Sequence, residues 1–109
     1  VSLWLFGLQS LFWGQAYASD YLGKVSVIHV RDADGLIWVY IEGTRTGERP
    51  TCADKEYLVI KNENSPAGQR QLALLMMAQA SNKTVFIEGA RTCTRWGDGE
   101  DINMLSIRK

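Results

Sequence analysis

The residues best suited to binding chemistry are concentrated in one short segment, residues 90–101. This segment, ARTCTRWGDGED, carries a tryptophan, two arginines and three acids within twelve positions. An aromatic ring beside such polar groups can stack on a sugar ring while its neighbours hydrogen-bond the hydroxyls. The candidate ligand-binding residues of this segment are Arg91, Arg95, Trp96, Asp98 and Asp101.

Each of these side chains also has a structural interpretation. Trp96 is suited to capping a domain beside a disulfide as well as to meeting a ligand. Asp98 and Asp101 can close the loop through hydrogen bonds to its backbone, or pair with its arginines. Together with Glu100 they could also form an oxygen-rich ion site. These alternatives stay open at the level of sequence.

The chain carries no catalytic signature, and we expect neither an enzyme nor a cofactor. We find no Ser/His/Asp constellation, no phosphate-binding glycine loop and no dinucleotide fingerprint. A single histidine and two cysteines are too few soft ligands for zinc. Asp32, Asp34 and Gly35 begin like a calcium loop, but Trp38 and Val39 follow where oxygen ligands belong, so a hairpin turn is favoured.

Charge excludes two further classes. The 109 residues hold 12 basic and 12 acidic side chains, with a formal net charge of zero. A general nucleic-acid binder or a polybasic membrane-surface protein needs a basic excess. We therefore expect no nucleic-acid partner.

The first eighteen residues differ from the rest because they carry no charge. VSLWLFGLQSLFWGQAY is rich in Leu, Trp and Phe, and Ala16-Tyr17-Ala18 supplies small residues in an A-x-A pattern. This arrangement is typical of a secretory signal peptide cleaved after Ala18. A membrane anchor or a retained amphipathic helix are the alternatives. The prediction is a secreted or periplasmic protein with one domain at residues 19–109 and no membrane span in the mature chain.

Export bears on the cysteines, because disulfides persist in oxidising compartments. Cys52 and Cys93 are the only two, and an even pair is most simply a disulfide. Closing a loop of roughly 41 residues would stabilise the domain by about 4 kcal/mol on the chain-entropy model. A catalytic cysteine is the rival interpretation, and it would need His29 nearby.

Runs of β-branched residues, turn compositions and one helical periodicity give the expected elements. Strands are expected at residues 24–31, 36–42, 56–61, 83–88 and 102–108, with a helix at 66–80. The order β-β-β-α-β-β is that of the five-stranded barrel of the oligonucleotide/oligosaccharide-binding (OB) fold. The alternative is an open α+β sheet with the helix on one face.

Two patterns predict which side chains are buried. Ser65-Pro66 is a helix start, and a core-facing stripe is expected at Leu72, Ala73, Leu75, Met76 and Ala80. Trp38 and Tyr40 share one face of the second strand and are interpreted as core or subunit-interface residues rather than a base-stacking platform.

Four stretches of the chain resemble a known family. They are GKVSVIHVRDADGLIWVYIEG (23–43), Cys52, AxxxNKTVFIEG (78–89) and CxxWxDxEDI (93–102). These stretches are similar to small exported proteins related to the B subunit of subtilase cytotoxin and to typhoid-toxin-like B subunits. The resemblance implies an OB barrel with a Cys52–Cys93 disulfide. For the toxin members it implies a ring of five subunits that binds sialylated glycans and carries a catalytic subunit.

The chain departs from the toxin pattern at the sugar pocket. The toxin subunits place a serine before the glycine that opens the first strand, whereas Leu22 precedes Gly23 here. Asp20 and Tyr21 lie near this corner without rebuilding the toxin pocket, and Tyr21 is kept as a candidate ligand-binding residue. The expected function is a non-catalytic binding module for a glycan, with a homo-oligomer implied by the resemblance. The alternative is a small periplasmic structural or adaptor protein.

Overall fold

The structure is a computed structural model, and it describes residues 19–109. The expected signal peptide, residues 1–18, lies outside the described residues. The elements in chain order are β1 (Ser19–Val30), β2 (Ile37–Gly47), β3 (Leu58–Val59), α2 (Pro66–Ser81), β4 (Thr84–Gly89) and β5 (Glu100–Ile107). Across the described residues, no helix is long and apolar enough to cross a membrane.

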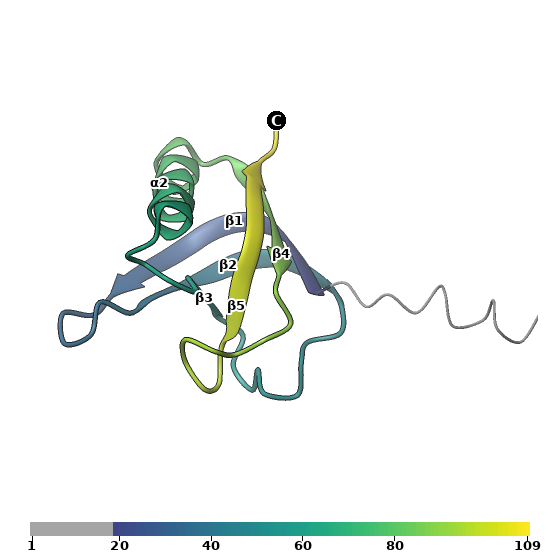
Figure 1. Ribbon diagram of the computed structural model, residues 1–109. Coiled ribbons are helices and arrows are strands. Elements are labelled where there is room, and N and C mark those ends of the chain that lie inside the picture. Colours follow the sequence, from purple (N-terminus) through teal and green to yellow (C-terminus); the bar gives the residue numbers. More distant parts are fainter. Residues whose placement is uncertain (1–18) are drawn as a thin grey trace, which may run out of the picture.

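The five strands form a closed barrel in the order β1-β2-β3-β5-β4, with β1 returning to pair with β4 (Figure 1). Strands β3 and β5 are parallel, and the other neighbours are antiparallel. With α2 between the third and fourth strands, this is the OB arrangement. The predicted fold class is confirmed, and the open-sheet alternative is wrong because β1 and β4, at the two ends of the strand order, pair with each other.

The interior of the barrel is aliphatic. Val39, Leu58, Val85 and Ile87 are each at most 1% exposed and belong to one packed cluster. A close approach of β1 to β2 supports this closure, because Gly23 pairs with Gly43 and a side chain on either would overlap the backbone of the other strand. The barrel interior is therefore filled by side chains, and a ligand can bind only on the outer surface of the barrel or at its loops.

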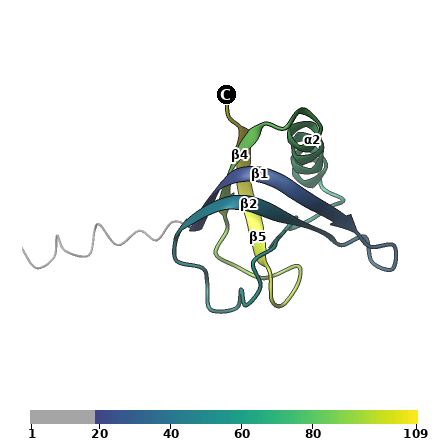
Figure 2. The ribbon, with the colours of Figure 1, turned by 180° about the vertical axis from the view of Figure 1, so that it is seen from behind.

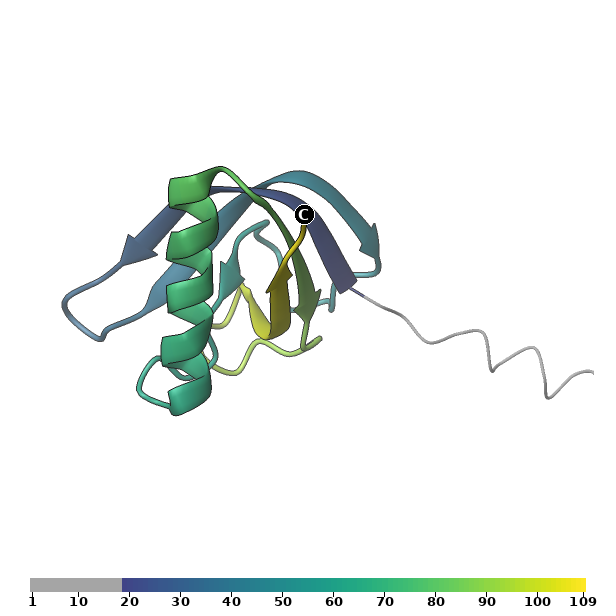
Figure 3. The same cartoon turned by 90° about the horizontal axis from the view of Figure 1, so that it is seen from above.

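The helix α2 lies across one end of the barrel (Figure 3). The Ser65 hydroxyl accepts a hydrogen bond from the Gly68 N–H at 2.9 Å, which caps the helix as expected. Only Gly68, Leu75 and Ala78 are buried. The prediction that Ala73, Met76 and Ala80 face the core is wrong, because all three are exposed. The helix packs on the barrel through Leu72, Leu74, Leu75 and Ala78 instead.

Several strand ends differ from the sequence prediction. Strand β1 begins at Ser19 and β2 extends to Gly47, since residues 20–24 pair with both β2 and β4. This pairing stabilises strand structure at Asp20 and Gly23, whose residue types are depleted in strands. In contrast, β3 is reduced to Leu58–Val59, where it bridges β2 and β5.

Candidate ligand-binding site

Aromatic rings gather on the outer side of β1 and β2. The register places His29 opposite Trp38, so both side chains leave the same face of the sheet. Their rings stack with centroids 4.7 Å apart and planes 14° apart. Tyr40, two residues after Trp38, meets the His29 ring edge-on at 5.8 Å. The alternation of β2 thus directs Val39 inward and both aromatic residues outward.

Two further rings extend this surface towards the loops. Tyr57, just before β3, packs edge-on against Tyr40 at 5.7 Å and lies 6.4 Å from Trp38. Trp96 joins from the β4–β5 loop (residues 90–99) through a shared contact with Arg31. Tyr40 and Trp96 remain 40% and 37% exposed. We call this surface the aromatic face, formed by His29, Trp38, Tyr40, Tyr57 and Trp96.

The position of Trp38 and Tyr40 corrects one part of the sequence interpretation. They are not core residues, because the barrel interior is filled by the inward side chains of the same strand. Their other interpretation, as subunit-interface residues, stays a prediction. Trp96 is partly exposed and contacts the Arg31 guanidinium, and its interpretation as a cap beside the disulfide stays a prediction.

Arg31 links the two tryptophans of the aromatic face. Its guanidinium carbon lies 4.6 Å from the centre of the Trp96 ring and 5.7 Å from that of Trp38. The same group donates two hydrogen bonds to Asp34, at 3.0 and 2.7 Å. This pairing, with the Leu36 N–H, lowers the pKa of Asp34 to about 2. The Arg31 charge is therefore held by a carboxylate from its own turn.

The β4–β5 loop lies directly on the outside of β3. A methyl group added at Gly99 would come within 2.5 Å of the Tyr57 ring and 2.8 Å of Val59. Val59 is fully buried, yet it lies outside the core cluster, because this loop covers it from the outer side. Only glycine permits so close an approach. The loop therefore places Trp96 at the margin of the aromatic face.

Asp98 joins the loop to the aromatic face through a hydrogen bond that it accepts from the Tyr57 hydroxyl. Burial and this carboxylate raise the pKa of Tyr57 to about 12, so the phenol keeps its proton at neutral pH. Beside this contact, Trp96, Gly97 and Asp98 border a hollow of about 280 Å³. Two of the sequence candidates, Trp96 and Asp98, are thus brought together here.

Arg95 links three connecting segments through the hydrogen bonds of its guanidinium group. Its guanidinium donates to both carboxylate oxygens of Glu63, at 3.0 and 3.1 Å, and to the Asp34 carbonyl at 2.9 Å. These contacts join the β4–β5 loop, the segment before α2 and the β1–β2 turn. The charge of Arg95 is thereby neutralised by a half-buried carboxylate.

Asp101 organises the β4–β5 loop from within. Its fully buried carboxylate accepts hydrogen bonds from the hydroxyls of Thr92 and Thr94, both at 2.7 Å, and from the backbone N–H groups of Thr94 and Arg95. Burial by itself raises the pKa of Asp101, but these donors outweigh it and the pKa is lowered. Asp101 therefore closes the loop, and its carboxylate is not exposed at the surface.

The same loop is fixed covalently. Cys52 and Cys93 form a disulfide with Cα atoms 6.2 Å apart, which confirms the predicted bond and rules out a catalytic thiol. It ties the β4–β5 loop to the β2–β3 loop (residues 48–57). Both loops lie at the end of the barrel away from α2 (Figure 2). The segments carrying Tyr57 and Trp96 are therefore cross-linked.

The remaining sequence candidates lie away from the aromatic face. Tyr21 is only 7% exposed, and Arg45 lies over its ring at 4.8 Å while pairing with the buried Glu100. Arg91 adopts a left-handed backbone with φ of 62° and donates its N–H to Glu100 and a guanidinium N–H to the Glu48 carbonyl. Both residues support the barrel end rather than the aromatic face.

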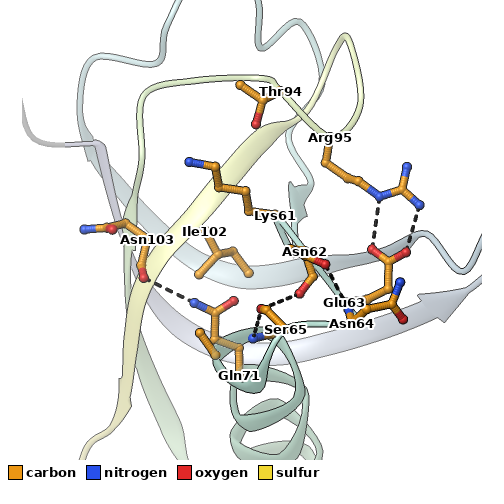
Figure 4. A pocket seen from close by; sticks show the side chains of 12 residues that line it. Lys61, Asn62, Glu63, Asn64, Ser65, Gln71, Thr94, Arg95, Ile102 and Asn103 are labelled. Atoms are coloured by element: carbon orange, nitrogen blue, oxygen red, sulfur yellow. Dashed lines mark hydrogen bonds and ion pairs between the residues drawn. The ribbon is translucent and has the colours of Figure 1, made fainter.

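A second hollow, of about 580 Å³, lies between the start of α2 and the β4–β5 loop (Figure 4). Its lining is largely polar and includes Asn62, Gln71, Thr94 and Asn103. The Gln71 amide donates to the Asn103 carbonyl at 3.2 Å. The Arg95–Glu63 pair forms its wall on the side of the β1–β2 turn.

Sequence reasoning missed His29, Arg31 and Tyr57 as site residues. The usable signal was the hairpin: residues that alternate outward on both sides of the turn at 32–35 must share a face. Tyr57 gave no such signal, because its position depends on a loop fold. Within residues 19–109, no group of three or more acids, histidines or cysteines could hold a metal ion.

Comparison with known proteins adds no identification. The chain matches no protein-family model, no curated protein and no solved structure. Its function must therefore be inferred from its own geometry.

Proposed function

We propose that the protein is a non-catalytic binding module that recognises carbohydrate on its aromatic face. The observation that carries the proposal is the set of five adjoining rings on the outer side of β1, β2 and β3, with partly exposed Tyr40 and Trp96 at its margin. In OB barrels this side of the sheet, with the β1–β2 and β4–β5 loops, binds oligonucleotides and oligosaccharides.

Sugar rings suit this surface. Their C–H faces pack on aromatic rings, and their hydroxyls need nearby hydrogen-bonding groups. The Asp98 carboxylate borders the rings and can accept such bonds, and the Arg31 guanidinium can donate through Nη1, which Asp34 does not engage. A barrel of fixed strands and a cross-linked loop hold these groups in place before the ligand arrives, which limits the entropy lost on binding.

Single-stranded nucleic acid is the competing ligand for an aromatic OB surface, because bases also stack on such rings. It requires in addition a positively charged groove along the strand. Here Arg31, which lies over both tryptophans, is paired with Asp34. Arg95, which precedes Trp96 in the chain, is paired with Glu63. This pairing favours carbohydrate over nucleic acid.

We place the protein outside the cytoplasm, secreted or periplasmic. The disulfide supports this location, because such bonds persist in oxidising compartments. A glycan-binding module there would meet envelope or host-surface sugars.

A glycan array probed with the disulfide-intact protein tests the function. Binding to oligosaccharides should be lost in Trp38→Ala and retained in Phe86→Ala, which truncates a ring on β4 instead. A wild-type protein that binds none of the glycans would overturn the proposal. Retained binding in Trp38→Ala would show that the aromatic face is not the site.

A second candidate is an adaptor that binds protein, or a homo-oligomer such as the ring of five that the resemblance implies. It is favoured by the exposed methionines Met76 and Met77 of α2, which are 55% and 58% exposed. The native mass of the protein at high concentration tests it. A mass of one chain would count against the oligomer, while a pentamer that dissociates in Tyr40→Ala would assign the aromatic face to the interface.

A further inference from the structure

The aromatic face carries an unusual charge arrangement for a sugar site. The Arg31 guanidinium, which lies over both tryptophans, is engaged on two nitrogens by Asp34. The Arg95 guanidinium, which also reaches the Asp34 carbonyl, is engaged in the same way by Glu63. Bidentate pairing of this kind occupies the guanidinium edge that arginine uses to bind a carboxylate or another planar anion. An anionic ligand arriving here meets cations that already have partners.

A third carboxylate, that of Asp98, lies at the border of the aromatic face. Asp98 accepts from Tyr57, and its carbonyl accepts the Lys55 N–H at 3.1 Å. Lys55 is followed by Glu56, so this pair adds no net charge to the border. Among Arg31, Arg95, Asp34, Glu63 and Asp98 the acids are in excess by one.

We infer that the aromatic face selects uncharged glycans, and that Asp34 is the residue that excludes acidic sugars by holding the Arg31 guanidinium. This inference rests on the proposed function and names the ligand class of the same site. A neutral sugar can pack on the rings and hydrogen-bond to Asp98. A sialic acid, uronic acid or sulfated sugar finds Arg31 and Arg95 already paired and is repelled by the excess acid.

Asp34 is suited to this role by its position and its ionisation. It is the acid that contacts the cation lying between Trp38 and Trp96. Because its pKa is lowered to about 2, the Asp34 carboxylate stays charged throughout the pH range in which the protein would meet glycans. Its Oδ1 atom also accepts the Leu36 N–H at 3.1 Å, which fixes the carboxylate within the turn.

The test compares matched pairs on a glycan array: neutral oligosaccharides and the same chains bearing a sialic acid, a uronic acid or a sulfate. The wild-type protein should reach half of its maximal binding to the neutral member at a concentration about fivefold lower than for the acidic member. This factor is the scale of one surface charge interaction. Asp34→Asn should reduce this preference at least twofold, because an amide keeps the oxygen acceptor for Leu36 but releases the Arg31 charge. Asp32→Asn, in the same turn, removes an equal charge without touching Arg31 and should leave the preference unchanged.

Salt provides a second readout that needs no variant. Raising NaCl from about 0.05 to about 0.5 M should leave the neutral affinity unchanged and raise the weak affinity for the acidic member, because screening removes repulsion. Equal or tighter binding of acidic members, or equal effects of the two asparagine variants, would overturn the inference while leaving glycan binding in place. Binding of no glycan at all would overturn the proposed function and this inference together.

Discussion

The ring of His29 is stacked on the ring of Trp38 across the β1–β2 hairpin, with centroids 4.7 Å apart. Because the two residues are direct partners in the strand register, the hairpin itself builds the centre of the aromatic face. The Tyr57 and Trp96 rings at its edge depend instead on the loops. The centre and the edge of the site should therefore respond to different substitutions.

Gly99 controls how closely the β4–β5 loop approaches β3. Gly99→Ala should lower the free energy of unfolding by about 1 to 3 kcal/mol, the usual range for overpacking, because its methyl group overlaps the Tyr57 ring. It should also weaken glycan binding by displacing Trp96. Gly97→Ala is the matched control, since a methyl group there meets nothing within 4 Å. Denaturant unfolding and glycan titration of both variants measure these effects, and equal behaviour of the two would contradict the loop packing.

The Cys52–Cys93 disulfide should stabilise both the domain and the site. Reduction should lower the free energy of unfolding by about 4 kcal/mol, the loop-closure value for this separation. Glycan affinity should fall as well, because the cross-link restrains the loop that carries Trp96. Unfolding and binding are measured with and without reductant. The double variant Cys52→Ala/Cys93→Ala is the control and should be insensitive to reductant; sensitivity in that variant would show that reduction acts elsewhere.

Asp101 should make stability fall in acid. Its pKa is lowered in the folded protein, so its contribution is fully present above the unfolded value of about 3.9 and is lost as the pH falls through the lower folded value. Asp101→Asn should lower the free energy of unfolding at pH 7 by about 1 to 3 kcal/mol. The same substitution should also make the free energy of unfolding less dependent on pH below about pH 4. Denaturant unfolding from neutral to acid pH checks this, with exposed Asp54→Asn as control. An undiminished acid slope in Asp101→Asn would assign the effect to another carboxylate.

The fold was predictable because its signals are local. Alternating β-branched residues mark β1, β2 and β4, and Ser65-Pro66 marks the start of α2. The strand ends were less predictable, since residues 20–23 lie outside the predicted strand and pair with both β2 and β4. The exposed side of α2 was also missed, because Met76 suits a core equally well by composition.

The site was predictable only in part. The composition of the β4–β5 loop identified Trp96 and Asp98, which the structure brings to the aromatic face. It could not separate them from Asp101, whose carboxylate turns inward to the threonines of its own loop. Tyr21 was expected near a ligand, yet its position in β1 directs the ring inward. Which way a side chain points depends on register and on loop folding, and neither is local.

The most direct test of the central claim is an NMR titration of the disulfide-intact protein with the neutral oligosaccharide that binds best on the array. The account predicts that chemical-shift changes on aromatic side chains concentrate at His29, Trp38, Tyr40, Tyr57 and Trp96, and that the Phe86 signals stay fixed. Shift changes centred instead on the polar hollow beside α2, at Asn62 and Gln71, would contradict it.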